Sequence, residues 1–185
     1  MNEFIKYLLQ FDNLNHQQIN FVKSKASELV VYKDEYFWEV GKMPKQVGFI
    51  YEGILRVCYF DKDGEDITRY FFEENHLIKE WEGFEATFYL QACTNCKFIV
   101  ISKDDWKEIS NTIVNWDAII QKIEAKLQIE KLERRSGLVS QDATTRYLSF
   151  LEKFPTVANR VALSHIASYI GVTQQSLSRI RRNIS

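Results

Sequence analysis

The C-terminal segment carries the side chains best suited to reading a nucleic acid. Gln174, Gln175 and Arg179 lie within one short stretch, and Arg181 and Arg182 follow directly. Glutamine and arginine can make bidentate hydrogen bonds to the edges of adenine and guanine, and additional arginines can bind phosphates. If this segment is helical, its polar and basic face would fit the major groove of DNA.

The apolar residues around this segment predict two short helices that cross. Ile166 and Ile170 are spaced by four, Leu177 and Ile180 by three, and Val172 lies between the pairs. At helical periodicity all five can face one small core. The spacing therefore indicates a helix-turn-helix.

Three further residues match the same motif. Ala167 is small enough for the point where the helices cross, and Gly171 suits the left-handed backbone that ends the first helix. Thr173 is placed to cap the second helix. The alternative is a helical hairpin whose charged face is only solvated. The motif predicts base contacts from Gln174, Gln175 and Arg179, and phosphate contacts from Thr173, Ser176, Arg181, Arg182 and His165.

Positive charge is concentrated at this end of the chain. Residues 134–185 contain eight Lys or Arg against two Asp or Glu, whereas the chain as a whole has a net charge of −1. A basic end on an acidic body is typical of a nucleic-acid-binding module joined to another domain.

Length and composition are those of an ordinary globular protein. The 185 residues and 45% hydrophobic content allow one full domain and a smaller one. The N-terminal stretch is too short and too interrupted for a signal peptide or a membrane helix. Three cysteines, an odd number, fit a reducing compartment better than a disulfide framework. These features predict a cytoplasmic protein without a membrane partner.

Short β-branched and aromatic runs dominate residues 29–102. Turn residues separate most of them, and Asp61 to Gly64 is a strong hairpin signal. Seven or eight short strands without long helices between them predict an antiparallel sandwich or jelly roll. Before them, residues 3–10 and 16–26 are expected to form two short helices, with Asn15 capping the second.

A long helix is expected from Val114 to about Arg135, after a short helix that begins with a capping box at Ser102 and Asp105. Its apolar residues step by three and four, as in the seam of a coiled coil. We expect this seam to join two copies of the chain, because a two-fold dimer places two recognition helices on the two halves of a palindromic DNA site. The alternative is that the seam packs on the β domain. The predicted interface residues are Trp116, Ile120, Ile123 and Leu127.

The resulting organisation is α+β, with three parts. Residues 1–112 form an antiparallel β-roll with flanking helices, residues 113–137 a dimerisation helix and hinge, and residues 138–185 the helix-turn-helix domain. This order resembles the CRP/FNR family of bacterial transcription regulators, over nearly the whole chain. The resemblance is sharpest in IASYIGVTQQSLSRIRR, residues 166–182, and in the hairpin region of residues 47–72.

The resemblance implies a sequence-specific DNA-binding regulator, with double-stranded DNA and a second copy as partners and RNA polymerase as a candidate partner. By motif position Gln174, Gln175 and Arg179 match the family's base-reading residues. Many members have Arg-Glu or Glu-x-x-Ser-Arg near this point, whereas this chain has Gln-Gln, so the family's common target sequence is not carried over to it. Many also continue into a β-wing beyond the recognition helix.

A cyclic nucleotide is not expected as effector. Members that bind cyclic AMP resemble one another in a phosphate cassette with an arginine, and the corresponding stretch here, residues 73–87, has five glutamates, one lysine and no arginine. A bound phosphodiester would meet net repulsion and lack a bidentate partner.

The remaining polar residues indicate neither a cofactor nor a metal. Cys93 and Cys96 form a Cys-x-x-Cys pair, but it is expected to straddle a β-turn, and the other cysteine and the three histidines are not spaced to complete a metal set. A cupin-like enzyme would need a histidine cluster on facing strands, whereas His76 is the only histidine in the β region. We therefore expect no enzymatic activity. The alternative to a regulator is a β-roll that senses a ligand or partner and carries a weak or vestigial DNA domain.

Overall fold

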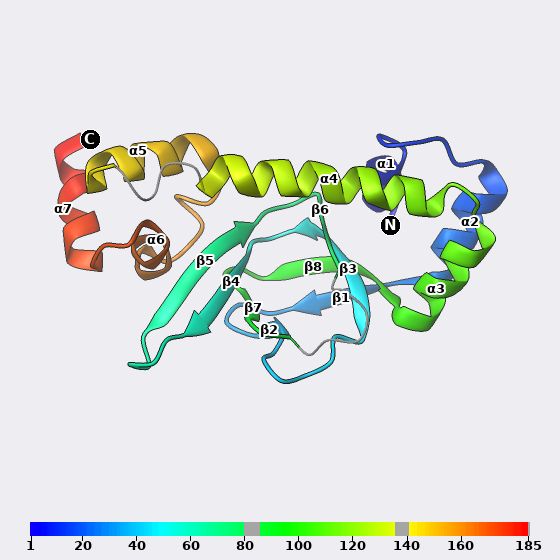
Figure 1. The fold of residues 1–185 in the computed structure, drawn as a ribbon, viewed down its shortest axis with the longest axis horizontal. Coiled ribbons are helices and arrows are strands. Elements are labelled where there is room, and N and C mark those ends of the chain that lie inside the picture. The colour runs from blue at the N-terminus through cyan, green and yellow to red at the C-terminus, as the bar shows by residue number, and fades with distance from the viewer. Residues whose placement is uncertain (80–85, 136–140, 185) are drawn as a thin grey trace.

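The computed structural model describes residues 1–79, 86–135 and 141–184. In these ranges the chain begins with two helices, continues through eight strands and ends with five helices (Figure 1). The strands are β1 (Ala26–Val31), β2 (Tyr36–Trp38), β3 (Gln46–Glu52), β4 (Leu55–Phe60), β5 (Asp66–Phe72), β6 (His76–Ile78), β7 (Tyr89–Ala92) and β8 (Cys96–Ser102). The helices are α1 (Asn2–Leu8), α2 (His16–Lys25), α3 (Lys103–Thr112), α4 (Trp116–Arg135), α5 (Ala143–Lys153), α6 (Leu163–Ile170) and α7 (Gln174–Ile184).

The strands form two antiparallel four-stranded sheets, in the orders β1-β8-β3-β6 and β2-β7-β4-β5. The β4–β5 hairpin turns at Gly64, which has a φ of +82°, as the turn signal predicts. The short strand β6 was not expected as a separate run. The α+β fold class is confirmed.

Two of the predicted helix starts, at Asn15 and at Ser102, are confirmed by their caps. Asn15 Oδ1 accepts from the Gln18 amide at 2.9 Å, and Gln18 Oε1 accepts in return from the Asn15 amide at 2.8 Å. Ser102 Oγ likewise accepts from the Asp105 amide at 3.1 Å and begins α3. Each cap satisfies amide groups that the first turn of a helix leaves without a partner.

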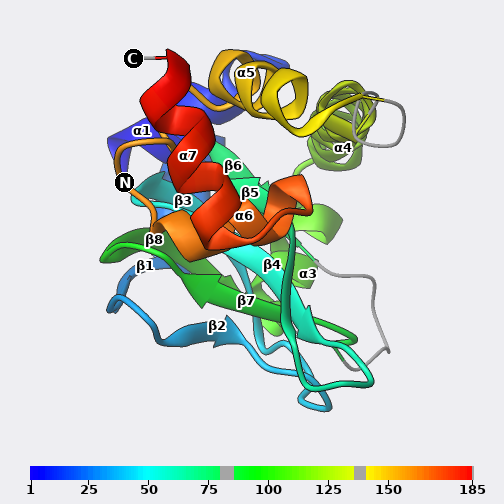
Figure 2. The ribbon, with the colours of Figure 1, turned by 90° about the vertical axis from the view of Figure 1, so that its left-hand side faces the viewer.

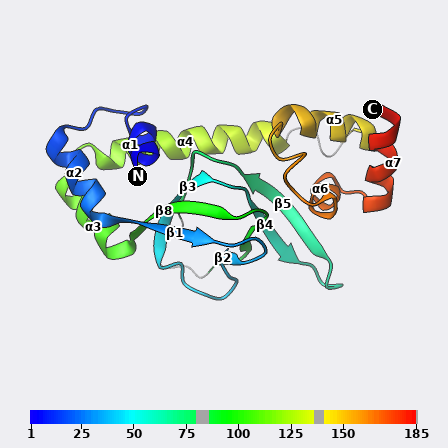
Figure 3. The same cartoon turned by 180° about the vertical axis from the view of Figure 1, so that it is seen from behind.

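Helix α4 runs along the β-roll, and its apolar seam faces this chain's own core (Figures 1 and 3). Trp116, Ile120 and Ile123 are buried in a cluster with residues of α1, α3 and β3. The rings of Trp116 and Trp106 lie edge to face with centroids 5.2 Å apart. The prediction that these residues join two copies is therefore wrong for Trp116, Ile120 and Ile123, because the β-roll and its flanking helices cover them.

A second apolar cluster lies between the two sheets and continues into the C-terminal helices. Its buried members include Leu55 and Phe98 of the β-roll as well as Phe150, Ile166 and Leu177 of α5, α6 and α7. One continuous core thus crosses the predicted boundary into the DNA-binding domain. The division of the chain into domains stays a prediction, and its hinge falls partly on residues outside the described ranges.

Among the described helices, none combines the length and the apolar character needed to cross a membrane.

Candidate nucleic-acid interface

Helices α6 and α7 form the crossed pair that the apolar spacing predicts. Gly171 ends α6 with a φ of +77°, and its amide donates to the Ala167 carbonyl at 2.9 Å. Thr173 Oγ1 then accepts from the Ser176 amide at 3.1 Å and caps α7. A side chain with a Cβ would be strained at Gly171, so glycine fixes how the chain leaves α6.

The inner faces of the two helices are apolar. Ile166, Ala167, Ile170 and Leu177 are all buried, and Val172 and Ile180 pack partly buried against the same cluster. Helix α5 completes this core through Tyr147 and Phe150. Burial of one narrow stripe orients α7, so that its remaining faces point away from the protein.

The predicted base-reading residues lie together on the outside of α7. Gln174, Gln175 and Arg179 are exposed, as are Thr173 and Ser176 at the start of the helix. Arg182 is exposed and Arg181 half-buried. Helix α7 has no acidic residue, so nothing on it repels a phosphate backbone. Figure 1 shows α7 at the left end of the molecule, with α6 between it and the sheets, and Figure 2 looks onto this end.

His165 does not belong to this surface. It is half-buried, and its Nδ1 lies 3.9 Å from Cys93 Sγ in the β-roll. Burial and the nearby Arg56 guanidinium lower the pKa of His165. The expectation that His165 contacts a phosphate is therefore wrong, because this side of α6 packs on the β-roll.

The cysteines are buried, as expected of structural residues. Cys93 and Cys96 lie on either side of the β7–β8 connection, and both are free, as is Cys58. Burial raises the pKa of Cys93 to about 12 and those of Cys58 and Cys96 to about 11. Thiols of this kind are poor nucleophiles at neutral pH. Within the described residues no group of three His, Cys, Asp or Glu could hold a metal ion.

A cavity of about 740 Å³ lies between the β-roll and α4. Its walls are largely apolar, from side chains such as Val57, Phe72 and Leu90, and Lys131 of α4 borders it. Burial lowers the pKa of Lys131. Leu127, which was expected at a dimer interface, lines this cavity, and so does Leu132. No local pattern in the sequence indicates this cavity, because its walls come from five strands and two helices that only the fold brings together.

The stretch compared with the nucleotide cassette lies only partly in the described ranges. Glu80, Glu82, Gly83 and Glu85 fall outside them, so the comparison with a cassette stays a prediction. In the described part, Glu73 and Glu74 are engaged by groups of the C-terminal region. Arg134 Nη2 lies 3.3 Å from Glu73 Oε2, and Arg160 Nη2 lies 2.6 Å from Glu74 Oε1.

Comparisons of the chain with family models and with curated proteins found no match. Solved structures, in contrast, match over most of its length. FixK2 from Bradyrhizobium japonicum is 18% identical with a TM-score of 0.72, covering 86% of this chain and 84% of that one. The c-di-GMP responsive global regulator CLP from Xanthomonas campestris is 14% identical with a TM-score of 0.72, covering 92% and 91%.

A transcriptional regulator of the CRP family from Thermus thermophilus is 16% identical with a TM-score of 0.68, covering 84% of this chain and 83% of that chain. These likenesses extend over more than four fifths of the chain. At such identities the likeness establishes architecture. The chain has the fold of the CRP/FNR transcription regulators.

Proposed function

We propose that this protein is a sequence-specific DNA-binding transcription regulator. The observation that carries the proposal is the exposed, acid-free polar face of α7, held outward by the buried stripe around Leu177. A helix of this kind fits the major groove of B-DNA. The similar structures are transcription regulators, which supports the same role and gives no support to an enzyme.

In this proposal the polar residues at the start of α7 and along it divide into two groups. Gln174, Gln175 and Arg179 read base edges, because 175 and 179 share one face and 174 adjoins them at the helix start. Thr173, Ser176, Arg181 and Arg182 bind the phosphate backbone. Base contacts supply sequence preference, whereas phosphate contacts supply affinity for any DNA.

We further propose that the protein acts as a homodimer, through the face of α4 opposite to its buried seam. Ala118, Ala125 and Leu132 recur every seven residues on α4 and are exposed, and Ile129 beside them is 59% exposed. Alanine lets two helices approach closely, and a seven-residue repeat is the period of a coiled coil. This face replaces the seam of Trp116, Ile120 and Ile123.

Measurements of DNA affinity at several salt concentrations test whether the protein is a sequence-specific DNA-binding regulator. Sites are selected from random DNA with purified protein, and affinity for the selected site and for a scrambled site is then measured between 50 and 200 mM salt. A regulator should prefer the selected site by roughly 10³-fold or more. Both affinities should fall with salt, because phosphate binding releases counterions. Equal affinity for both sites would contradict the proposal.

Cyclic AMP and cyclic GMP are not expected to regulate this protein, since no arginine follows β5 until α4. Calorimetric titration of the purified protein with each nucleotide is expected to show no binding. A micromolar affinity for either would contradict this part of the proposal.

The second candidate is a β-roll that senses a ligand or partner, with a weak DNA domain. The cavity of about 740 Å³ beneath α4 favours it, because such a volume is typical of small-molecule sites. The DNA experiment separates the two, since a sensor with a vestigial DNA domain should select no consensus site.

A further inference from the structure

The helix-turn-helix is docked on the edge of a β-sheet. Strand β5 is the last strand in the order β2-β7-β4-β5, so one side of its backbone has no neighbouring strand. Ser168 of α6 covers this side. Its Oγ accepts from the Thr68 amide at 2.9 Å and donates to the Asp66 carbonyl at 3.0 Å. Helix α6 thereby satisfies backbone groups that an open edge would expose to water.

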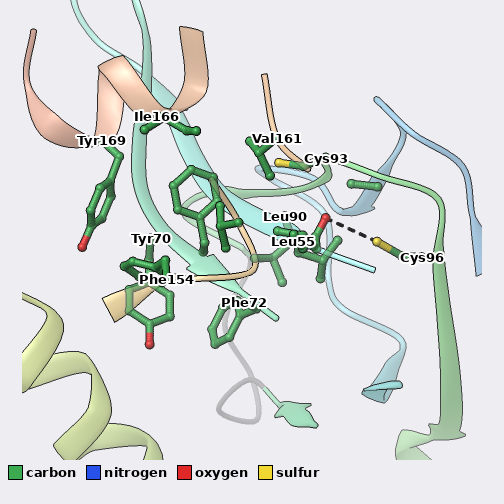
Figure 4. Packing of buried hydrophobic residues seen from close by; sticks show 14 of the residues in the cluster. Leu55, Tyr70, Phe72, Leu90, Cys93, Cys96, Phe154, Val161, Ile166 and Tyr169 are labelled. Atoms are coloured by element: carbon green, nitrogen blue, oxygen red, sulfur yellow. Dashed lines mark hydrogen bonds between the residues drawn. The ribbon is translucent and has the colours of Figure 1, made fainter. Parts of the chain in front are cut away.

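Aromatic rings reinforce this docking. Phe71 of β5 is fully buried, and its ring centroid lies 5.5 Å from Tyr169 and 5.9 Å from Phe154. Figure 4 shows Tyr169, Phe154 and Tyr70 gathered where α6 meets the strands. The docked position is thus a packed contact, and it must be opened if the module is to move.

Charged groups close the end of the same contact. The Glu74 carboxylate receives both Nη atoms of Arg160, at 2.6 and 3.1 Å, and also the Gly53 amide at 2.8 Å. Glu73 accepts from Thr156 Oγ1 and pairs with Arg134. We call Glu73, Glu74, Thr156 and Arg160 the Glu74 latch. It ties the end of β5 to the segment between α5 and α6.

The Glu74–Arg160 pair is charged and only partly shielded from solvent ions. Burial disfavours the ionised form of Glu74, but hydrogen bonds from Arg160 and from backbone amides favour this form more strongly. The pKa of Glu74 is therefore lowered. The Glu74 and Arg160 side chains keep 26% and 36% of their surface exposed. An ion pair of this exposure is weakened by competing anions.

We propose that the Glu74 latch holds the helix-turn-helix in a docked state, and that DNA draws the module out of this state by competing for its cations. Arg160 lies three residues before α6 begins at Leu163. The first helix of a helix-turn-helix crosses the DNA backbone, so a cation at this place is one that phosphates attract. In the docked state the Glu74 carboxylate binds this arginine instead. The part of this proposal in which DNA competes for the cations rests on the proposed function.

The first test compares Glu74→Gln with Glu52→Gln. Glutamine at 74 retains an oxygen for the Gly53 amide and removes the charge that binds Arg160. Glu52 is an exposed β-roll acid paired with Lys97 at 2.7 Å, so its variant makes the same charge change without removing a side-chain contact of the latch. The readout is hydrogen exchange of the Thr68 amide, which Ser168 protects in the docked state.

Exchange of Thr68 is expected to quicken about tenfold in Glu74→Gln, as for the loss of a charged hydrogen bond, and to stay near wild type in Glu52→Gln. Amides of β8, such as Ile99, serve as an internal reference for global unfolding. Equal Thr68 rates in the two variants, or equal acceleration at Ile99, would overturn the latch.

The second test measures DNA affinity of the same proteins. If the docked state dominates and does not bind, the apparent Kd of Glu74→Gln falls by the same factor as its docking equilibrium shifts. Glu52→Gln should bind like wild type. Thr68 exchange could instead quicken while DNA affinity stays unchanged or becomes weaker. That result would show that the docked state itself binds DNA, and it would disprove the proposal that DNA competes with Glu74 for Arg160.

The two proposals fail in different ways. If wild-type protein selects no DNA site, the proposed function fails, whereas Thr68 exchange still decides whether the latch exists. A double-variant cycle completes the design. Thr68 protection should fall in Arg160→Gln and in Glu74→Gln, and it should fall little further when the two changes are combined. If the effects of the two single variants simply add in the double variant, the two side chains do not act as a pair.

Discussion

Helices α4 and α7 each carry an apolar stripe along a polar helix, yet they use it differently. The stripe of α7, through Leu177 and Ile180, packs on α6 and leaves a polar face exposed for a partner. The stripe of α4, through Trp116, Ile120 and Ile123, packs on the β-roll, although its heptad spacing resembles that of a dimer seam. An apolar period therefore predicts which face of a helix is buried, but not what buries it.

The contrast also separates the two faces of α4. Its buried seam belongs to the monomer, and the exposed series that includes Ala125 and Leu132 is the one proposed to meet a second copy. Substitutions on the two faces should thus have different consequences, from loss of folding to loss of assembly.

The largest effect is expected from Ile120→Asp combined with Ile123→Asp. Both side chains are buried against the β-roll, so the change places two carboxylates in an apolar core and should cost at least about 4 kcal/mol of unfolding free energy. Denaturant unfolding followed by circular dichroism measures it, with the exposed Gln121→Asp as control. A well-folded monomeric double variant would show that the seam is a dimer interface after all.

The next effect is expected from Ile129→Glu combined with Leu132→Glu. Both side chains are exposed, so the fold should persist with a stability change below about 1 kcal/mol, while repulsion between copies should convert dimers to monomers. Sedimentation measures assembly. The control is Lys107→Glu on α3, at a site that is also exposed. It makes the same charge change as two added carboxylates, but at a position away from α4. An unchanged dimer would place the interface elsewhere.

On α7, Arg179→Ala should cost about 1–3 kcal/mol of binding per half-site and relax the preference at one base pair. Arg182→Ala should instead weaken all DNA alike and reduce the salt slope by roughly one unit. Site selection from random DNA with each variant is the measurement. Identical selected sites from wild type and Arg179→Ala would show that this arginine does not read a base.

The smallest effect concerns pH. Burial lowers the pKa of His165, so the unfolded chain takes up a proton first as pH falls below the ordinary value of about 6.5. Stability contributed by neutral His165 is therefore lost between that value and the lowered pKa of the folded state. His165→Gln should flatten the pH dependence of unfolding between pH 7 and 5.5, whereas His16→Gln, at an exposed site, should not. Parallel profiles for both variants would argue against burial of a neutral His165.

Local signals determined much of this protein. Gly171, Ala167 and Thr173 specify the helix-turn-helix by backbone conformation, size and capping, and each acts within a few residues of its own position. Alternating strands and the turn at Gly64 likewise specify the β-roll. The polar face of α7 follows from the same short-range rules, because its buried stripe is contained in the motif.

Only the tertiary structure decided which part of the molecule packs against each helix face. The seam of α4 looks the same whether a β-roll or a second copy covers it, and His165 looks exposed until α6 is docked on β5. The pairing of Glu74 with Arg160 joins residues 86 positions apart, and the cavity under α4 is assembled from several strands. Such contacts depend on how distant elements pack, and periodicity along one segment contains no information about the surface that meets it.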